Sequence, residues 1–142
     1  MSINGILTNE FKEYLLKSSF KNIKEPEAIG SLYLGLSITE LDKKSSLIDV
    51  TDHIETMYER QLITFSDIII TPDSSKIINL NEINFGPWMS TCYEKIKSLF
   101  ITNEIEGKDG MLLACFPLIE NILGRKNDEL FIAKGNLEIT LE

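Results

Sequence analysis

Apolar residues recur at helical spacing in four segments of the chain, and this periodicity predicts four helices. The segment 87–100 has the best-formed start, because Pro87 follows Gly86 and suits the first helical position. The segment 110–124 is apolar nearly all round, which is typical of a central helix, and Pro117 predicts a kink or break within it. Two further amphipathic helices are expected, a short one over residues 9–19 and a longer one over residues 47–62.

Strand patterns occupy the gaps between these helices. Residues 32–39 alternate between large apolar and smaller side chains; a helix after Pro26 fits almost as well, but the two glycines in this region favour a strand. Two further pairs of apolar segments are each separated by turn-forming residues, which is typical of a β-hairpin. The expected hairpins join 67–71 to 76–84 and 130–133 to 137–141.

Helices segregated from hairpins, without alternating strand and helix units, predict an α+β fold. We expect about four helices packed with a small, mostly antiparallel sheet built from hairpins. At 142 residues the chain has the commonest size of one domain, so residues 1–142 are expected to form a single globular domain.

The sequence favours a cytoplasmic protein that does not bind a membrane. The amino terminus lacks the form of a secretory signal, and the longest apolar run, Met111 to Ile119, is far shorter than the ~20 residues of a membrane span. In such a chain Cys92 and Cys115 are expected to be reduced and buried, since both lie in apolar patterns.

Acidic residues outnumber basic ones by 22 to 14, giving a net charge of −8, and the whole surplus lies after Lys44. Residues 49–82 are the most acidic part. A concentrated negative field attracts cationic partners and repels the phosphates of nucleic acids, so direct nucleic-acid binding is not expected.

The predicted helix 47–62 places much of this charge on one face. At 3.6 residues per turn its carboxylates lie opposite the apolar side, and no lysine four residues further on offsets them. Mutual repulsion lowers the stability of a helix, which favours a role outside folding, such as docking a basic protein. The candidate partner-binding residues are Asp49, Asp52, Glu55, Glu59, Asp73 and Glu82.

His53 is the single histidine, and Asp49 and Glu55 are close to it in the sequence. Carboxylates could orient its imidazole or hold a cation with it, so a carboxylate- and metal-dependent hydrolase is an alternative function. One histidine with carboxylates rarely completes a transition-metal site, which favours a histidine at the border of a solvated helix face. We therefore expect no metal and no cofactor.

Other chemistry has little support in the sequence. The nucleotide-binding, metalloprotease and esterase signatures are absent. Phe85, Trp88 and Tyr93 could form an exposed aromatic anchor, but their helical spacing favours core packing.

Three hypotheses of function follow. The first is a small acidic binding protein, such as an inhibitor or immunity protein that neutralises a basic partner like a toxin nuclease. The second is the hydrolase built around His53. The third is an oligomeric adaptor or structural subunit that dimerises through the Trp88 face or an open sheet edge.

Overall fold

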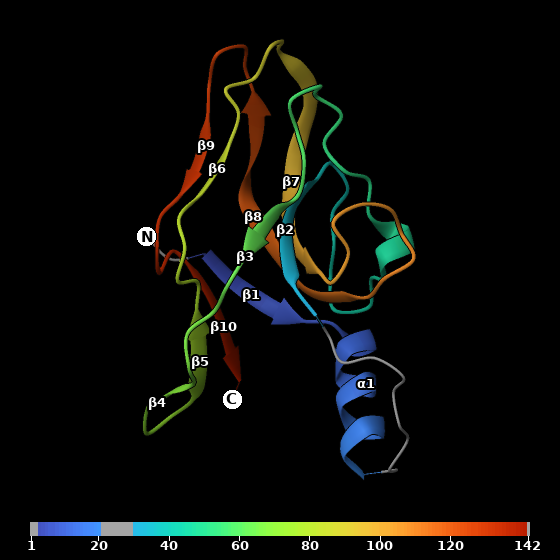
Figure 1. Cartoon of the computed structure of the whole chain (residues 1–142), viewed down its shortest axis with the longest axis vertical. Coiled ribbons are helices and arrows are strands. Elements are labelled where there is room, and N and C mark those ends of the chain that lie inside the picture. Colours follow the sequence, from blue (N-terminus) through green and yellow to red (C-terminus); the bar gives the residue numbers. More distant parts are fainter. Residues whose placement is uncertain (1–2, 21–29, 142) are drawn as a thin grey trace.

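Strands dominate the structure, a computed structural model that describes residues 3–20 and 30–141 (Figure 1). The strands are β1 (Ile3–Leu7), β2 (Leu32–Ser37), β3 (Gln61–Ile63), β4 (Ile69–Ile70), β5 (Ser75–Ile78), β6 (Ile83–Phe85), β7 (Cys92–Thr102), β8 (Leu112–Gly124), β9 (Leu130–Ile132) and β10 (Leu137–Leu141). Among the described residues there is one α-helix, α1 (Asn9–Phe20), and one 3-10 turn, η1 (Leu47–Asp49).

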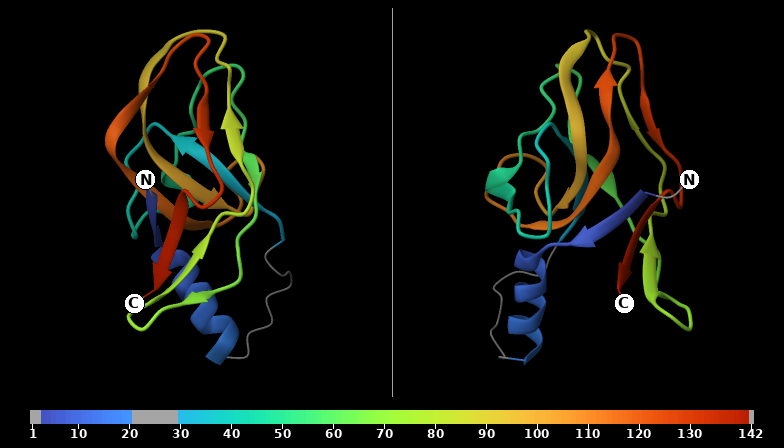
Figure 2. Two further views of the ribbon diagram at one scale, coloured as in Figure 1. Left: turned by 90° about the vertical axis from the view of Figure 1, so that its left-hand side faces the viewer. Right: turned by 180° about the vertical axis from the view of Figure 1, so that it is seen from behind.

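Eight of these strands form one curled sheet in the order β3-β2-β7-β8-β1-β10-β5-β4, and β6 pairs with β9 in a small second sheet. All neighbours are antiparallel except β1 and β10, which are parallel. The large sheet bends into a half-barrel, as the side and back views show (Figure 2). The two ends of the sheet order, β3 and β4, are consecutive in the chain.

The prediction of an α+β fold with about four helices is wrong. Only the first predicted helix, 9–19, is confirmed, as α1. Segment 87–100 forms most of β7, and segment 110–124 forms β8. Segment 47–62 contains η1, irregular backbone and the start of β3.

Irregular register between β7 and β8 explains why both strands carry helical spacing. From Ile96 to Ser98 two steps along β7 face five along β8, from Ile122 to Pro117, and around this shift Ile96 and Leu99, three residues apart, both lie in the main core. A second shift lies where Ile101 pairs with Ala114 and Thr102 with Leu112, which leaves Leu113 as the extra residue. Each bulge turns the alternation of a strand into a step of three.

Residues 98–102 of β7 and 112–116 of β8 are also buried on both faces, which removes the contrast between apolar and polar positions there. One face contributes to the main core with Leu99 and Phe116, and the opposite face packs Phe100 and Cys115 into a second cluster. Residues 41–50 cover that second face with three buried side chains. These are Leu41, Leu47 and Val50.

The strand predictions fared better than the helices. Residues 32–39 contain β2, so the helix alternative is wrong for the described residues from Gly30 onward, whereas residues 21–29 lie outside the described part. The hairpin of 67–71 with 76–84 is confirmed by the pairing of β4 with β5. Residues 130–133 and 137–141 do contain strands, but β9 pairs with β6 and β10 with β1 and β5, so this hairpin is wrong.

Cys92 and Cys115 are buried free thiols, as expected. Burial raises the pKa of the Cys115 thiol to about 11, and the nearby Asp42 carboxylate acts in the same direction. In the part of the chain that the structure describes, no helix has the length and apolar character needed to cross a membrane. The cytoplasmic location stays a prediction.

Candidate functional site

Two loops come together at the upper end of the molecule in Figure 1: residues 50–60, which lead into β3, and residues 86–91, which lead into β7. Four aromatic rings from these loops and from β6 pack against one another in a row. The His53 ring lies 4.9 Å from the Trp88 ring and 5.8 Å from the Tyr58 ring, both edge-on. Tyr58 in turn stacks on Phe85, with 6.0 Å between centroids. The packing of these rings stabilises the two loops against each other.

The Glu55 carboxylate ties the two loops to each other. Only 6% of this residue is exposed. One oxygen, Oε2, accepts a hydrogen bond from the Met57 backbone N–H at 2.7 Å. The other, Oε1, accepts from the backbone N–H groups of Met89 at 2.8 Å and Ser90 at 3.3 Å. A single side chain therefore fixes the distance between loop 50–60 and loop 86–91.

These hydrogen bonds hold Glu55 in its ionised form. Burial alone would raise its pKa, but the three N–H groups and the nearby His53 outweigh burial and lower the pKa below its usual value. Charge-assisted hydrogen bonds of this kind are stronger than neutral ones. We call these three hydrogen bonds of Glu55 the Glu55 clamp. The clamp is stronger at neutral pH, where Glu55 is ionised, than at acid pH.

Above the clamp, the two loops and the start of β7 expose large apolar side chains. We call this surface the loop patch; it consists of Ile54, Met57, Met89 and Tyr93, which are 64%, 51%, 62% and 83% exposed. A hollow of about 370 Å³ lies between the loops, lined by Ile54 and Tyr93 and by polar residues that include Thr56, Ser90 and Glu94. Two side chains of the loop patch therefore border a hollow of mixed apolar and polar character, and the hydrogen bonds of Glu55 hold the two loops in place.

His53 is buried, and neither of its ring nitrogens has a hydrogen-bond partner. Burial lowers its pKa, although the Glu55 charge opposes this, so the ring is neutral at neutral pH. Within the described residues no three side chains of His, Cys, Asp or Glu gather as metal ligands would. Asp49, the other proposed hydrolase residue, is exposed and accepts a hydrogen bond from the Ser46 N–H at 2.9 Å.

Asp52, which also lies in loop 50–60, belongs to a separate polar cluster with Tyr58 and Arg60. Its two oxygens accept hydrogen bonds from Arg60, at 2.8 Å from Nη2 and 3.1 Å from Nε, and Tyr58 donates its hydroxyl to the same carboxylate. Burial, and then the Asp52 charge, raises the pKa of Tyr58. Arg60 also donates to the carbonyls of Glu104 at 3.1 Å and Gly107 at 2.9 Å. Asp52 and Arg60 therefore latch the loop after β7 onto the body.

The six predicted partner-binding residues do not form one row, because segment 47–62 is not a helix. Asp52 and Glu55 point inward and are engaged in the contacts described above. The other four are exposed and spread over the surface: Asp49 at the end of η1, Glu59 before β3, Asp73 in the turn between β4 and β5, and Glu82 before β6. Asp52 and Glu59 line one hollow of about 360 Å³ together with Glu106.

The sequence analysis missed Met89 and Ile54, and it placed Tyr93 in the core with Trp88. Trp88 and Phe85 are indeed buried, but Tyr93 is among the most exposed large side chains. The residues that follow Tyr93 are the only usable signal, since Glu94 and Lys95 put three exposed positions in a row. No signal in the sequence links Glu55 to Met89, because the fold alone brings them together.

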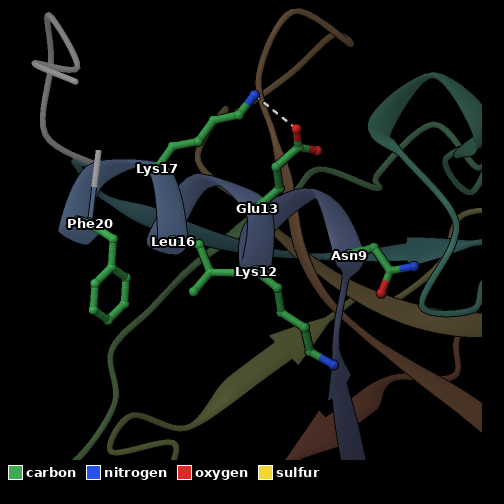
Figure 3. Close-up of a pocket in the computed structure, with 6 residues that line it drawn as sticks. All are labelled: Asn9, Lys12, Glu13, Leu16, Lys17 and Phe20. Carbon is green, nitrogen blue, oxygen red and sulfur yellow. Dashed lines mark ion pairs between the residues drawn. The ribbon is translucent and has the colours of Figure 1, made fainter. Parts of the chain in front are cut away.

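A third hollow, of about 390 Å³, lies along α1 (Figure 3). Its lining residues all come from this one helix, with Leu16 and Phe20 exposed beside Lys12. Lys17 and Glu13 form an ion pair at 2.8 Å across it. Because one helix supplies all the lining residues that belong to the described part of the chain, the hollow brings no distant groups of that part together for chemistry.

No model of a known protein family matches the sequence, and no curated protein is similar to it. Function is therefore inferred from the geometry of this site. The loop patch is the candidate site, because its exposed apolar side chains lie on two loops that the buried Glu55 carboxylate holds together.

Proposed function

We propose that the chain is a small acidic binding protein that contacts a positively charged protein through the loop patch. The observation that carries this proposal is the Glu55 clamp. Burying a carboxylate is unfavourable unless several donors satisfy it, and here those donors belong to two surface loops. A surface whose loops are already ordered loses less entropy on binding a partner.

The composition of the loop patch supports a protein partner. Tyrosine and methionine are enriched in protein interfaces, and a few such side chains supply most of the binding energy. Tyr93 and Met89 have the exposure that an anchor needs before its partner arrives. The hollow beside Ile54 offers space for one side chain of the partner.

The net charge of −8 supports a basic partner. Complementary charge speeds the encounter and makes it sensitive to salt, whereas the apolar contacts set the lifetime of the complex. An inhibitor or immunity protein that covers the basic nucleic-acid site of a toxin nuclease in the cytoplasm has these properties. In this proposal Asp49, Glu59 and Glu82 steer the partner without touching it.

The test compares the wild type with Tyr93→Ser and with Phe131→Ser, a matched control. Phe131 is an exposed aromatic residue on β9, outside the loop patch. Each protein is immobilised, and the proteins retained by the wild type are identified, purified and measured one by one. We expect Tyr93→Ser to lower the affinity for a true partner by about 30-fold, as the loss of a hot-spot residue does. Phe131→Ser should change this affinity little.

The charge requirement is tested on the same complexes by raising the salt concentration. A basic partner should bind more slowly at high salt, with a smaller change in its dissociation rate. A partner that tolerates Tyr93→Ser, or one whose association rate ignores salt, contradicts the proposal.

A further inference from the structure

The two outer edges of the large sheet are treated differently. At β3 the outer edge is covered: the Asn81 side chain donates to the Leu62 carbonyl at 2.8 Å and accepts from the Thr64 N–H at 2.9 Å. At the other end of the sheet order, β4 has no neighbour on its outer side among the residues that the structure describes. The hairpin of β4 and β5 lies at the lower end in Figure 1, away from the loop patch.

The alternation of hydrogen bonds between β4 and β5 shows which backbone N–H and C=O groups are unpaired on the outer edge of β4. The Thr71 N–H bonds the Ser74 carbonyl at 2.8 Å and closes the turn, so Thr71 and Ser74 are a hydrogen-bonded pair. In an antiparallel ladder such pairs alternate, which makes Ile69 the next residue that bonds β5. The N–H and C=O of Ile70 therefore point outward.

This part of the chain also exposes apolar side chains. Ile70 is 79% exposed and Ile68 is 65% exposed. Natural sheets usually protect an open edge with a lysine, a proline or a bulge. Here three isoleucines stand in a row before Pro72, and no charge interrupts them. This edge has both the free backbone groups and the apolar surface that a pairing strand needs.

The charges that flank the edge specify the occupant. Asp67 precedes the isoleucines and Asp73 follows them, and both are exposed. If a second copy of the chain paired antiparallel on this edge, Asp67 of one copy would lie near Asp73 of the other, at both ends. Like charges thus disfavour self-pairing, whereas basic residues at both ends of a foreign strand would be attracted.

We propose that the β4 edge binds an extended segment of a partner protein in which β-branched residues lie between basic flanks. The segment adds a strand to the sheet next to β4 and contacts the exposed side chains of Ile68 and Ile70. This inference is independent of the loop patch, because the two surfaces lie at opposite ends of the long axis (Figures 1 and 2). Either surface can therefore fail its test alone.

The probe is a fluorescent peptide of sequence KKTVTVTKK. Two related peptides separate strand pairing from charge: EETVTVTEE reverses the flanks, and KKTVPVTKK keeps the charge but cannot form a regular strand. We expect the first peptide to bind at least tenfold more tightly than either of the others. Equal binding of the proline peptide would show plain charge attraction and would overturn the proposal.

Two variants of the protein place the same lysine on different edges. Ile70→Lys puts a charge on the open edge, and Leu62→Lys puts one on the covered edge at a side chain that is 53% exposed. We expect at least tenfold weaker peptide binding for Ile70→Lys and little change for Leu62→Lys. Equal effects of the two lysines would overturn the proposal, because they change net charge equally.

Hydrogen exchange gives a readout that reports the pairing itself. On peptide binding the Ile70 amide should become protected, while the Ile69 amide, already bonded to β5, should not change. Light scattering on the free protein tests whether a second copy of the chain occupies the β4 edge instead. A dimer that Ile70→Lys abolishes, together with no peptide binding, would assign the edge to a second copy and overturn the proposal.

Discussion

Replacing Glu55 by glutamine keeps the shape of the side chain but turns one of its two acceptor oxygens into a donor. At least one backbone N–H of Met57, Met89 or Ser90 then loses its acceptor. We expect the free energy of unfolding to fall by about 1–3 kcal/mol at neutral pH, measured by urea denaturation. Glu82→Gln, at an exposed carboxylate, is the control and should change it little.

The pH dependence of this loss follows from the lowered pKa of Glu55. A carboxylate with a depressed folded pKa stabilises the protein above its unfolded pKa, and this contribution is lost as the pH falls through the folded pKa. The wild type and Glu55→Gln should therefore converge in stability below about pH 4, near the ordinary pKa of glutamate. A constant difference down to acid pH would show that the charge of Glu55 is not what holds the loops.

His53 gives a second pH effect at a higher pH. Its folded pKa is lowered by burial, so between that value and about pH 6.5 the unfolded state binds a proton that the folded state does not. The wild type should lose stability as the pH falls below about 6.5. Because neither ring nitrogen has a hydrogen-bond partner, His53→Phe should keep the aromatic packing and remove this loss.

Urea midpoints of wild type and His53→Phe at several pH values measure this effect. The two proteins should differ little near neutral pH and diverge towards acid pH. If both lose stability in parallel below about pH 6.5, the titrating group is not His53.

Part of the site could be predicted at this scale and part could not. The sequence analysis identified the buried thiols and pointed to residues 49–59 as an unusual segment. It could not tell which carboxylates were free, because the partners of Asp52 and Glu55 include Arg60 and Met89, which only tertiary structure brings near. From the sequence alone, a carboxylate with no cationic residue nearby in the chain is therefore predicted to be exposed, even when the fold buries it.

Among the elements, the strand and helix assignments failed where strands are buried on both faces. Residues 112–116 are all buried, so no polar position marks the alternation of β8. By contrast α1, an amphipathic helix without a buried residue, matched its pattern. β2 also matched, although residues 34–37 are all buried, because its glycine favoured a strand over a helix. The sequence alone could not reveal bulges or the residues that cover a second face.

Gly35 permits the close approach of β2 and β7. It pairs with Phe100, and a Cβ atom there would lie 2.3 Å from that ring. We expect Gly35→Ala to lower the free energy of unfolding by about 1–3 kcal/mol, because the ring must move within a packed cluster. Combining it with Phe100→Leu should cost less than the sum of the two single changes.

Gly30→Ala is the matched control for this change, since among the described residues no atom other than those of its chain neighbours lies within 4 Å of the Cβ it would add. Its denaturation midpoint should stay close to that of the wild type. Full additivity of Gly35→Ala and Phe100→Leu would mean that the ring is not the source of the strain.

The latch between β3 and the loop after β7 depends on the fork of Arg60. Lysine keeps the charge but cannot bond Asp52, Glu104 and Gly107 together. We expect Arg60→Lys to cost about 1–3 kcal/mol and to speed amide hydrogen exchange in residues 104–107. Arg125→Lys, at an exposed arginine, should do neither. Unchanged exchange in that loop would show that the latch does not order it.

For the whole molecule, the pairing of β1 with β10 predicts that the sheet unfolds as one unit. Leu137 is fully buried on β10, and Leu137→Ala should cost about 2–5 kcal/mol. The single tryptophan, Trp88, lies at the other end and reports independently of circular dichroism. Both signals should give one common midpoint in wild type and variant, as a single domain requires. Two separate transitions would divide the chain into two domains.

The position of β10 in the middle of the sheet has a consequence for the chain as it is made. Its neighbours β1 and β5 are synthesised earlier, and each lacks one of its two strand partners until residues 137–141 have left the ribosome, although β1 can already pair with β8 and β5 with β4. The large sheet therefore stays divided between β1 and β5 until then, and these two open edges must be kept from aggregating in the meantime.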